Sequence, residues 1–72
     1  MKSQIVIKEE FIKLDSLLKL SGLASTGGHA KILILNGEVK VNGEVCLQRG
    51  KKIYIDDTVE YNGNILTLKN AD

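Results

Sequence analysis

Few residues in this 72-residue sequence could do covalent chemistry, and they do not form a recognisable catalytic arrangement. His29 and Cys46 could act as base and nucleophile, but no feature of the sequence brings them together. A half-buried structural cysteine is the alternative interpretation of Cys46. Asp56 and Asp57 resemble a carboxylate pair, yet they lie between two expected strands and indicate a turn. The sequence therefore favours a protein that is not an enzyme.

The stretch "STGGHAK" could bind an anion without catalysing a reaction. Ser25 or Thr26 can cap a helix there, and glycines in its first turn leave backbone amides uncovered at the positive end of the helix dipole. A phosphate can approach such an end closely, and Lys31 adds a full charge one turn along. Alternatively, Gly27 and Gly28 only allow two helices to pack closely. The glycine spacing does not match a phosphate-binding loop.

Length and composition indicate one small domain, residues 1–72, with 43% hydrophobic residues. The single cysteine cannot form an internal disulfide, and no Cys/His cluster indicates a metal. We expect no cofactor and no small-molecule substrate. The first ten residues hold no apolar run long enough for a signal or membrane segment, so we expect no membrane partner. The cysteine content favours the reduced cytoplasm. We also expect a monomer.

Charge is unevenly distributed along the chain although the formal net charge is only +1. Residues 29–52 contain five basic and two acidic residues, a net charge of +3, whereas residues 53–72 have a net charge of −3. Such an asymmetry can orient a charged partner even when the total is near zero. An ordinary mixed surface is the alternative.

Hydrophobic patterning predicts a strand and two helices in the first half of the chain. The strand covers residues 4–7, and the first helix covers residues 14–20, with residues 11–13 as an entry turn of uncertain state. The second helix starts after the Ser25–Thr26 cap and ends at Asn36-Gly37. Its expected buried residues are Ala30, Leu33 and Ile34, with Ile32 and Leu35 widening the apolar face.

From Glu38 onward the residue types favour strands. Asn42-Gly43 and Asn62-Gly63 each predict a two-residue hairpin turn, and "KIYI" predicts a strand between the two hairpins. The coarse order is β-α-α-β-β-β-β. This order predicts an α+β domain in which two helices pack on a small, mostly antiparallel sheet.

Three segments together resemble the RNA-binding domain first seen in ribosomal protein S-four, also called the alpha-L motif. Lys13-Leu14-Asp15 matches the family's first helix, with lysine in place of arginine. Thr26, Ala30 and Lys31 match its second helix, and residues 37–43, "GEVKVNG", match its hairpin. The resemblance covers about residues 11–61 and is strongest to stand-alone bacterial proteins of the YaaA/YbcJ type.

The resemblance implies a non-enzymatic module that binds structured RNA, such as ribosomal or ribosome-associated RNA, through its two helices and adjoining hairpin. The implied contacts are Lys13, Thr26, Lys31, Lys40 and Asn42, with the amides of Gly27 and Gly28; charge alone adds Arg49, Lys51 and Lys52. Two positions depart from the family pattern. Gly27 replaces the usual arginine, and Glu44 stands at a position that is often basic.

The three aromatic residues, Phe11, Tyr54 and Tyr61, are not spaced as a stacking platform. Recognition of RNA shape is therefore expected rather than reading of single-stranded bases. Two other functions remain open. The chain could be a protein-interaction adaptor that docks through Leu35 and its apolar neighbours. It also resembles a ubiquitin-like sulfur carrier, but it ends "LKNAD" without the terminal Gly-Gly that such carriers need.

Overall fold

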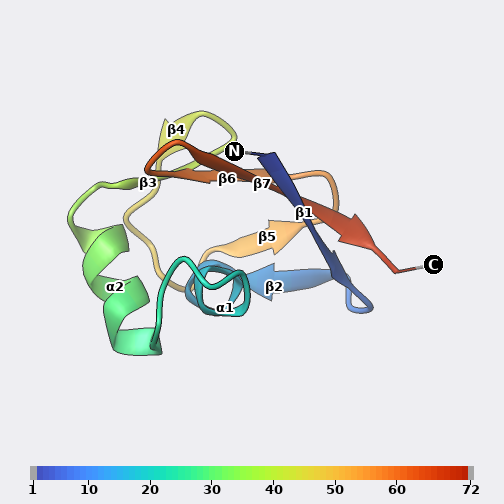
Figure 1. The fold of residues 1–72 in the computed structure, drawn as a ribbon, viewed down its shortest axis with the longest axis horizontal. Helices are drawn as coiled ribbons and strands as arrows, with labels where there is room; N and C mark the ends of the chain where they lie inside the picture. The colour runs from blue at the N-terminus through green and yellow to red at the C-terminus, as the bar shows by residue number, and fades with distance from the viewer. Residues whose placement is uncertain (1, 72) are drawn as a thin grey trace.

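The computed structural model describes residues 2–71 and shows two helices beside a five-stranded sheet and a two-stranded ribbon (Figure 1). Met1 and Asp72 lie outside the described residues, and so does the end of the chain on which the sulfur-carrier alternative depends. The elements are β1 (Lys2–Ile7), β2 (Phe11–Lys13), α1 (Leu14–Leu20), α2 (Gly27–Leu35), β3 (Val39–Val41), β4 (Glu44–Val45), β5 (Lys52–Tyr54), β6 (Thr58–Tyr61) and β7 (Asn64–Asn70).

The five-stranded sheet has the order β1-β7-β6-β3-β4. β1 runs parallel to β7, and the other neighbouring strands are antiparallel, so the prediction of a mostly antiparallel sheet is confirmed. Both predicted hairpin turns are present. Asn42 and Gly43 have φ values of 51° and 87°, and Asn62 and Gly63 have 51° and 82°. A tight turn with two positive φ angles favours Asn-Gly, which explains why this dipeptide occurs at both hairpins.

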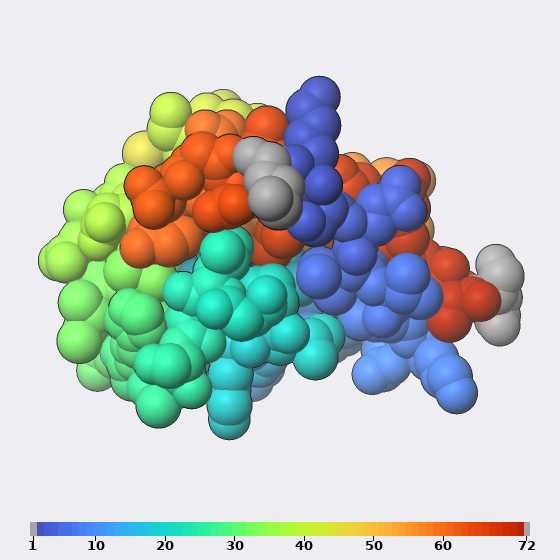
Figure 2. Space-filling view, in the orientation of Figure 1, coloured from blue at the N-terminus to red at the C-terminus, as the bar shows by residue number. Residues whose placement is uncertain are grey.

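The core lies between the helices and one face of the sheet. α1 contributes Leu14, Leu17 and Leu18, and α2 contributes the predicted residues Ala30, Leu33 and Ile34. The sheet contributes alternate residues of β3, β6 and β7, because successive side chains of a strand point to opposite faces. In Figure 2 the cyan and green residues of α1 and α2 lie side by side, below the orange residues of the sheet. The α+β prediction is confirmed.

Residues 11–13 are a correction to the sequence prediction. They form strand β2 rather than a turn, and they pair antiparallel with β5, Phe11 opposite Tyr54 and Lys13 opposite Lys52. β5 ends at Tyr54, one residue before the end of the predicted strand. The observed order has two more strands than the predicted order, since β2 precedes α1 and five strands, not four, follow α2.

Candidate nucleic-acid interface

Four of the predicted RNA contacts gather where α1 begins, and backbone hydrogen bonds place them there. The chain turns at Arg49-Gly50, so that its carbonyl groups face the first turn of α1. The Leu14 amide donates to the Lys51 carbonyl at 2.9 Å, and the Asp15 amide donates to the Arg49 carbonyl at 3.1 Å. These bonds satisfy amides that a helix cannot pair internally. We call the exposed side chains at this place the α1 cationic cluster: Lys13, Arg49, Lys51 and Lys52.

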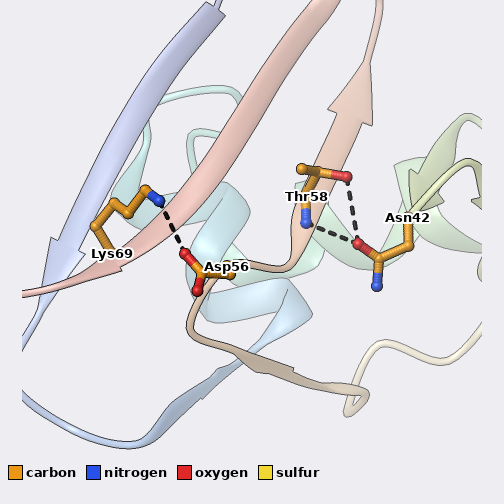
Figure 3. A network of polar contacts seen from close by, with 4 residues as sticks. All are labelled: Asn42, Asp56, Thr58 and Lys69. Carbon is orange, nitrogen blue, oxygen red and sulfur yellow. Dashed lines mark hydrogen bonds and ion pairs between the residues drawn. The ribbon is translucent and has the colours of Figure 1, made fainter.

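The α1 cationic cluster forms no ion pair among the described residues, although Asp15 lies in the first turn of α1 and Glu44 lines a pocket with Lys51. Across residues 2–71 the one ion pair joins Lys69 to Asp56, with 2.8 Å between Nζ and Oδ1, at a different place in the fold (Figure 3). Lys13 and Lys52 lie directly opposite each other on β2 and β5. Like charges in such a cross-strand pair repel each other. The electrostatics of the cluster therefore favour an incoming anion.

Lys13 is also an unfavourable residue for the start of a helix. It occupies the N-cap position of α1, and its side chain makes no capping hydrogen bond. An ammonium group offers no acceptor for the exposed amides, and its charge has the same sign as this end of the helix dipole. Folding stability alone does not explain a lysine at this position.

The start of α2 leaves two backbone amides open to solvent. Thr26 is the N-cap, because its Oγ1 accepts from the His29 amide at 3.0 Å and its carbonyl accepts from the Ala30 amide at 3.0 Å. The amides of Gly27 and Gly28 have no acceptor among the described residues, and both glycines are exposed. An anion could take both hydrogen bonds.

Close helix packing does not explain these glycines. A Cβ atom at Gly27 would meet nothing within 4 Å, and one at Gly28 would meet only Thr26 Oγ1 at 3.8 Å. Neither glycine has a positive φ. The alternative that the glycines serve close packing of the two helices is therefore wrong.

His29 has a structural role in the same turn. Its ring Nδ1 accepts a hydrogen bond from the Ser25 amide at 3.1 Å, so the neutral ring has its proton on Nε2. The ring thus helps to cap α2 together with Thr26. Cys46 lies elsewhere: it follows Val45, whose side chain approaches Gly37 at the opposite end of α2. The geometry offers no His29–Cys46 pair, and no group of three potential metal ligands occurs among residues 2–71.

The structure separates Lys40 from the other predicted contacts. Val39 and Val41 are buried against the helices, so Lys40 leaves the opposite face of β3. Its cross-strand neighbours are Glu60 on β6 and Val45 on β4. Lys31 is exposed on α2, which contributes buried residues to the same core as Val39 and Val41. A single surface that joins these two lysines is not formed.

The Asn42 side chain joins two segments of the fold (Figure 3). Its Oδ1 accepts from the Thr58 amide at 2.9 Å and lies 3.3 Å from the Thr58 hydroxyl, and its Nδ2 donates to Asp57 at 3.1 Å. These bonds tie the β3–β4 turn to the start of β6. Asn42 also lines a surface pocket with Lys51 and Glu44, and the acidic group weakens the attraction of that pocket for phosphate. These hydrogen bonds give Asn42 a structural role, and its contact with RNA stays a prediction.

Two of the three aromatic residues form a pair that the sequence analysis did not predict. Phe11 and Tyr54 lie opposite each other on the β2–β5 ribbon, with ring centroids 5.7 Å apart and a 48° angle between the rings. Lys52 Nζ lies 4.8 Å from the centroid of the Phe11 ring. The sequence did contain a signal for this pairing: "FIK" and "KIY" are mirror images, so antiparallel pairing places ring opposite ring and lysine opposite lysine.

Comparison with known proteins agrees with this geometry. The sequence-family model of the S4 domain matches residues 5–69 of this chain. The chain is 41% identical over 63 residues to RlbA of Bacillus subtilis (strain 168), provisionally named a ribosome maturation protein, covering 88% of this chain and 89% of that protein. It is 40% identical over 57 residues to YbcJ of Escherichia coli (strain K12), provisionally named an RNA-binding protein, covering 79% and 81%.

The solution structure of Escherichia coli YbcJ, described as revealing an alpha-L motif involved in RNA binding, superposes with a TM-score of 0.67 at 34% identity. The match covers 94% of this chain and 85% of YbcJ. Neither helix of the described residues is long and apolar enough to cross a membrane. The extent of the family match and the shared fold lead to one conclusion: this chain belongs to the S4 domain family and has the alpha-L fold.

Proposed function

We propose that this protein is a non-catalytic, monomeric module of the cytoplasm that binds structured RNA, with ribosomal RNA or a ribosome-associated RNA as its target. The principal contact is the α1 cationic cluster. A second contact is the start of α2, where the Gly27 and Gly28 amides and Lys31 take a further phosphate. Lys40 and Asn42 do not contact the RNA in this proposal.

The observation that carries the proposal is that the four cations of the α1 cationic cluster form no ion pair within residues 2–71. When such cations neutralise phosphates, the counterions condensed on the nucleic acid are released, and this release supplies much of the affinity of nucleic-acid-binding proteins. The names of RlbA and YbcJ support the ribosomal target and the RNA ligand, respectively.

A direct test is titration of the protein with structured fragments of ribosomal RNA, and with unstructured RNA of equal length, over a series of salt concentrations. We expect tighter binding to the structured fragments. With about three to five phosphates neutralised, the plot of log affinity against log salt should have a slope of about −2 to −4. Absence of binding at low salt, or a flat salt dependence, would contradict the proposal. Equal affinity for both RNAs would remove the preference for structure.

A second function, docking of a protein partner, has a separate observation in its favour. Ile32 and Leu35 on α2 and Val45 and Leu47 after the β3–β4 turn are each more than half exposed. Gly37 lies beside Val45, which brings the end of α2 to this side of the hairpin. Replacing Leu35 and Val45 with serine tests this function, because it should abolish partner binding without changing affinity for RNA.

A further inference from the structure

The outer face of the β2–β5 ribbon carries a pair of aromatic rings and a pair of lysines, and the expected RNA contacts do not include the rings. We propose that this face binds an unpaired RNA base, which stacks on Tyr54 while Lys13 and Lys52 hold the adjoining phosphates. The inference rests on the proposed RNA binding and adds to it a site for single-stranded RNA next to the structured part.

The antiparallel register makes the four side chains a compact array. Phe11 and Lys13 lie on one strand, Tyr54 and Lys52 lie on the other, and Ile12 and Ile53 between them point into the protein. Neighbours along a strand face are about 7 Å apart, and directly opposite Cβ atoms are about 5 Å apart. A base on one corner of this array is therefore within reach of a lysine side chain from another corner.

Tyr54 is the ring that is available for stacking. Its side chain is exposed, with 47% of the residue's surface accessible, whereas Phe11 is only partly exposed and Lys52 Nζ lies over its ring. Phe11 thus packs beside Tyr54 at a tilted angle and contacts Lys52 by a cation–π interaction. Stacking on an aromatic ring together with a nearby cation is the general mode by which proteins bind single-stranded nucleic acid.

Hydrogen bonds and a buried neighbour hold the Tyr54 backbone in place, and the nearby Asp57 carboxylate is hydrogen-bonded. The Tyr54 amide donates to Asp57 Oδ2 at 2.8 Å, and Asp57 Oδ1 accepts from Asn42 at 3.1 Å. Ile53 is fully buried. The alternative is that the aromatic pair only stabilises the ribbon. That alternative does not account for two lysines facing each other with no ion-pair partner within residues 2–71.

The test compares two RNA probes: a blunt RNA hairpin, and the same hairpin with a six-nucleotide single-stranded overhang. The proposal predicts that Tyr54→Ala weakens binding of the overhang hairpin about 5- to 150-fold and binding of the blunt hairpin less than twofold. Tyr54→Phe should restore most of the affinity, because it keeps the ring. Circular dichroism and thermal unfolding of each variant show whether the fold is intact.

Tyrosine fluorescence gives a second measurement that does not depend on the stability of Tyr54→Ala. The chain has two tyrosines and no tryptophan, so in a Tyr61→Phe background Tyr54 is the one remaining tyrosine. We expect the overhang hairpin to quench its fluorescence, and the blunt hairpin to quench it much less.

The outcomes separate this inference from the proposed function. If both hairpins bind the natural protein, but Tyr54→Ala weakens both equally or neither, and if Tyr54 fluorescence does not respond, the stacking site is refuted and RNA binding stands. If neither hairpin nor any ribosomal RNA fragment binds the natural protein at low salt, the proposed function fails, and the stacking site fails with it.

Discussion

Replacing Lys13 with glutamate should change stability and RNA binding in opposite directions. Lys13 faces Lys52 across the β2–β5 ribbon and lies at the N-cap of α1. Lys13→Glu turns the cross-strand repulsion into an attraction, which is worth about 0.2–1 kcal/mol. It also gives the start of α1 a charge that its dipole favours, worth about 0.3–1 kcal/mol. Together these terms should raise the free energy of unfolding by about 0.5–2 kcal/mol.

Thermal unfolding at low salt measures the expected gain in stability of Lys13→Glu. For a domain of this size, about 1 kcal/mol shifts the Tm by roughly 4–8 °C, so Lys13→Glu should raise the Tm by about 2–16 °C. The increase should shrink at about 1 M salt, where the Debye length falls to about 3 Å. The same variant should bind structured RNA more weakly, because a carboxylate then faces the phosphate in place of an ammonium group.

Two further variants show whether charge at the start of α1 causes the change in stability. Lys13→Gln has nearly the same shape as Lys13→Glu but no charge, and it should give a smaller increase in Tm. Lys19→Glu makes the same charge change in the last turn of α1, where a cation is favourable, so it should lower the Tm. If Lys13→Glu lowers the Tm, or leaves RNA affinity unchanged, the account of the α1 cationic cluster is wrong.

Three other substitutions test the supporting structure. Asn42→Ala should lower the free energy of unfolding by about 1–3 kcal/mol in chemical denaturation, since Thr58 and Asp57 lose their partner, and it should leave the salt dependence of RNA binding unchanged. Thr26→Ala should cost about 1 kcal/mol, because the His29 amide loses its cap; no loss would show that the cap does not contribute. Gly28→Ala should raise the Tm by about 2–8 °C, since a Cβ fits there and alanine favours the helix; a lower Tm would contradict the open surroundings of this glycine.

Elements with local signals were predicted from the sequence. The Thr26 cap and the Asn-Gly dipeptides act within a few residues of themselves, so their effects can be derived without knowing the rest of the fold. The three buried residues of α2, Ala30, Leu33 and Ile34, follow from helical spacing. For these elements the local preference and the final structure agree.

The β2–β5 ribbon could not be predicted in the same way. Phe11–Lys13 is too short to show a periodic pattern, and it becomes a strand only because β5, about forty residues later, pairs with it. The mirrored triplets "FIK" and "KIY" suggest this pairing only after an antiparallel alignment is assumed. The aromatic pair was missed for the same reason.

The candidate site was predicted in its residue types but not in its arrangement. Charge and family resemblance indicated Lys13, Lys51 and Lys52, but their meeting at the start of α1 depends on long-range backbone bonds. The alternation of Val39, Lys40 and Val41 shows that Lys40 points away from the valines, but the sequence does not show which face the helices cover. Side-chain bonds of Asn42 to a distant turn are likewise absent from any local pattern.

The most direct test of the central claim compares the salt dependence of RNA binding for two double variants of equal charge. Arg49→Gln with Lys51→Gln removes two members of the α1 cationic cluster but keeps the backbone carbonyls that hold α1. Lys2→Gln with Lys8→Gln removes two exposed lysines of β1 and the turn that follows it. The account predicts that the first pair reduces the steepness of the log–log slope by about 2 and that the second pair leaves the slope nearly unchanged. If both double variants reduce the steepness of the slope equally, net charge and not the α1 cationic cluster governs RNA binding. If the first pair leaves the slope unchanged, the cluster does not contact the RNA.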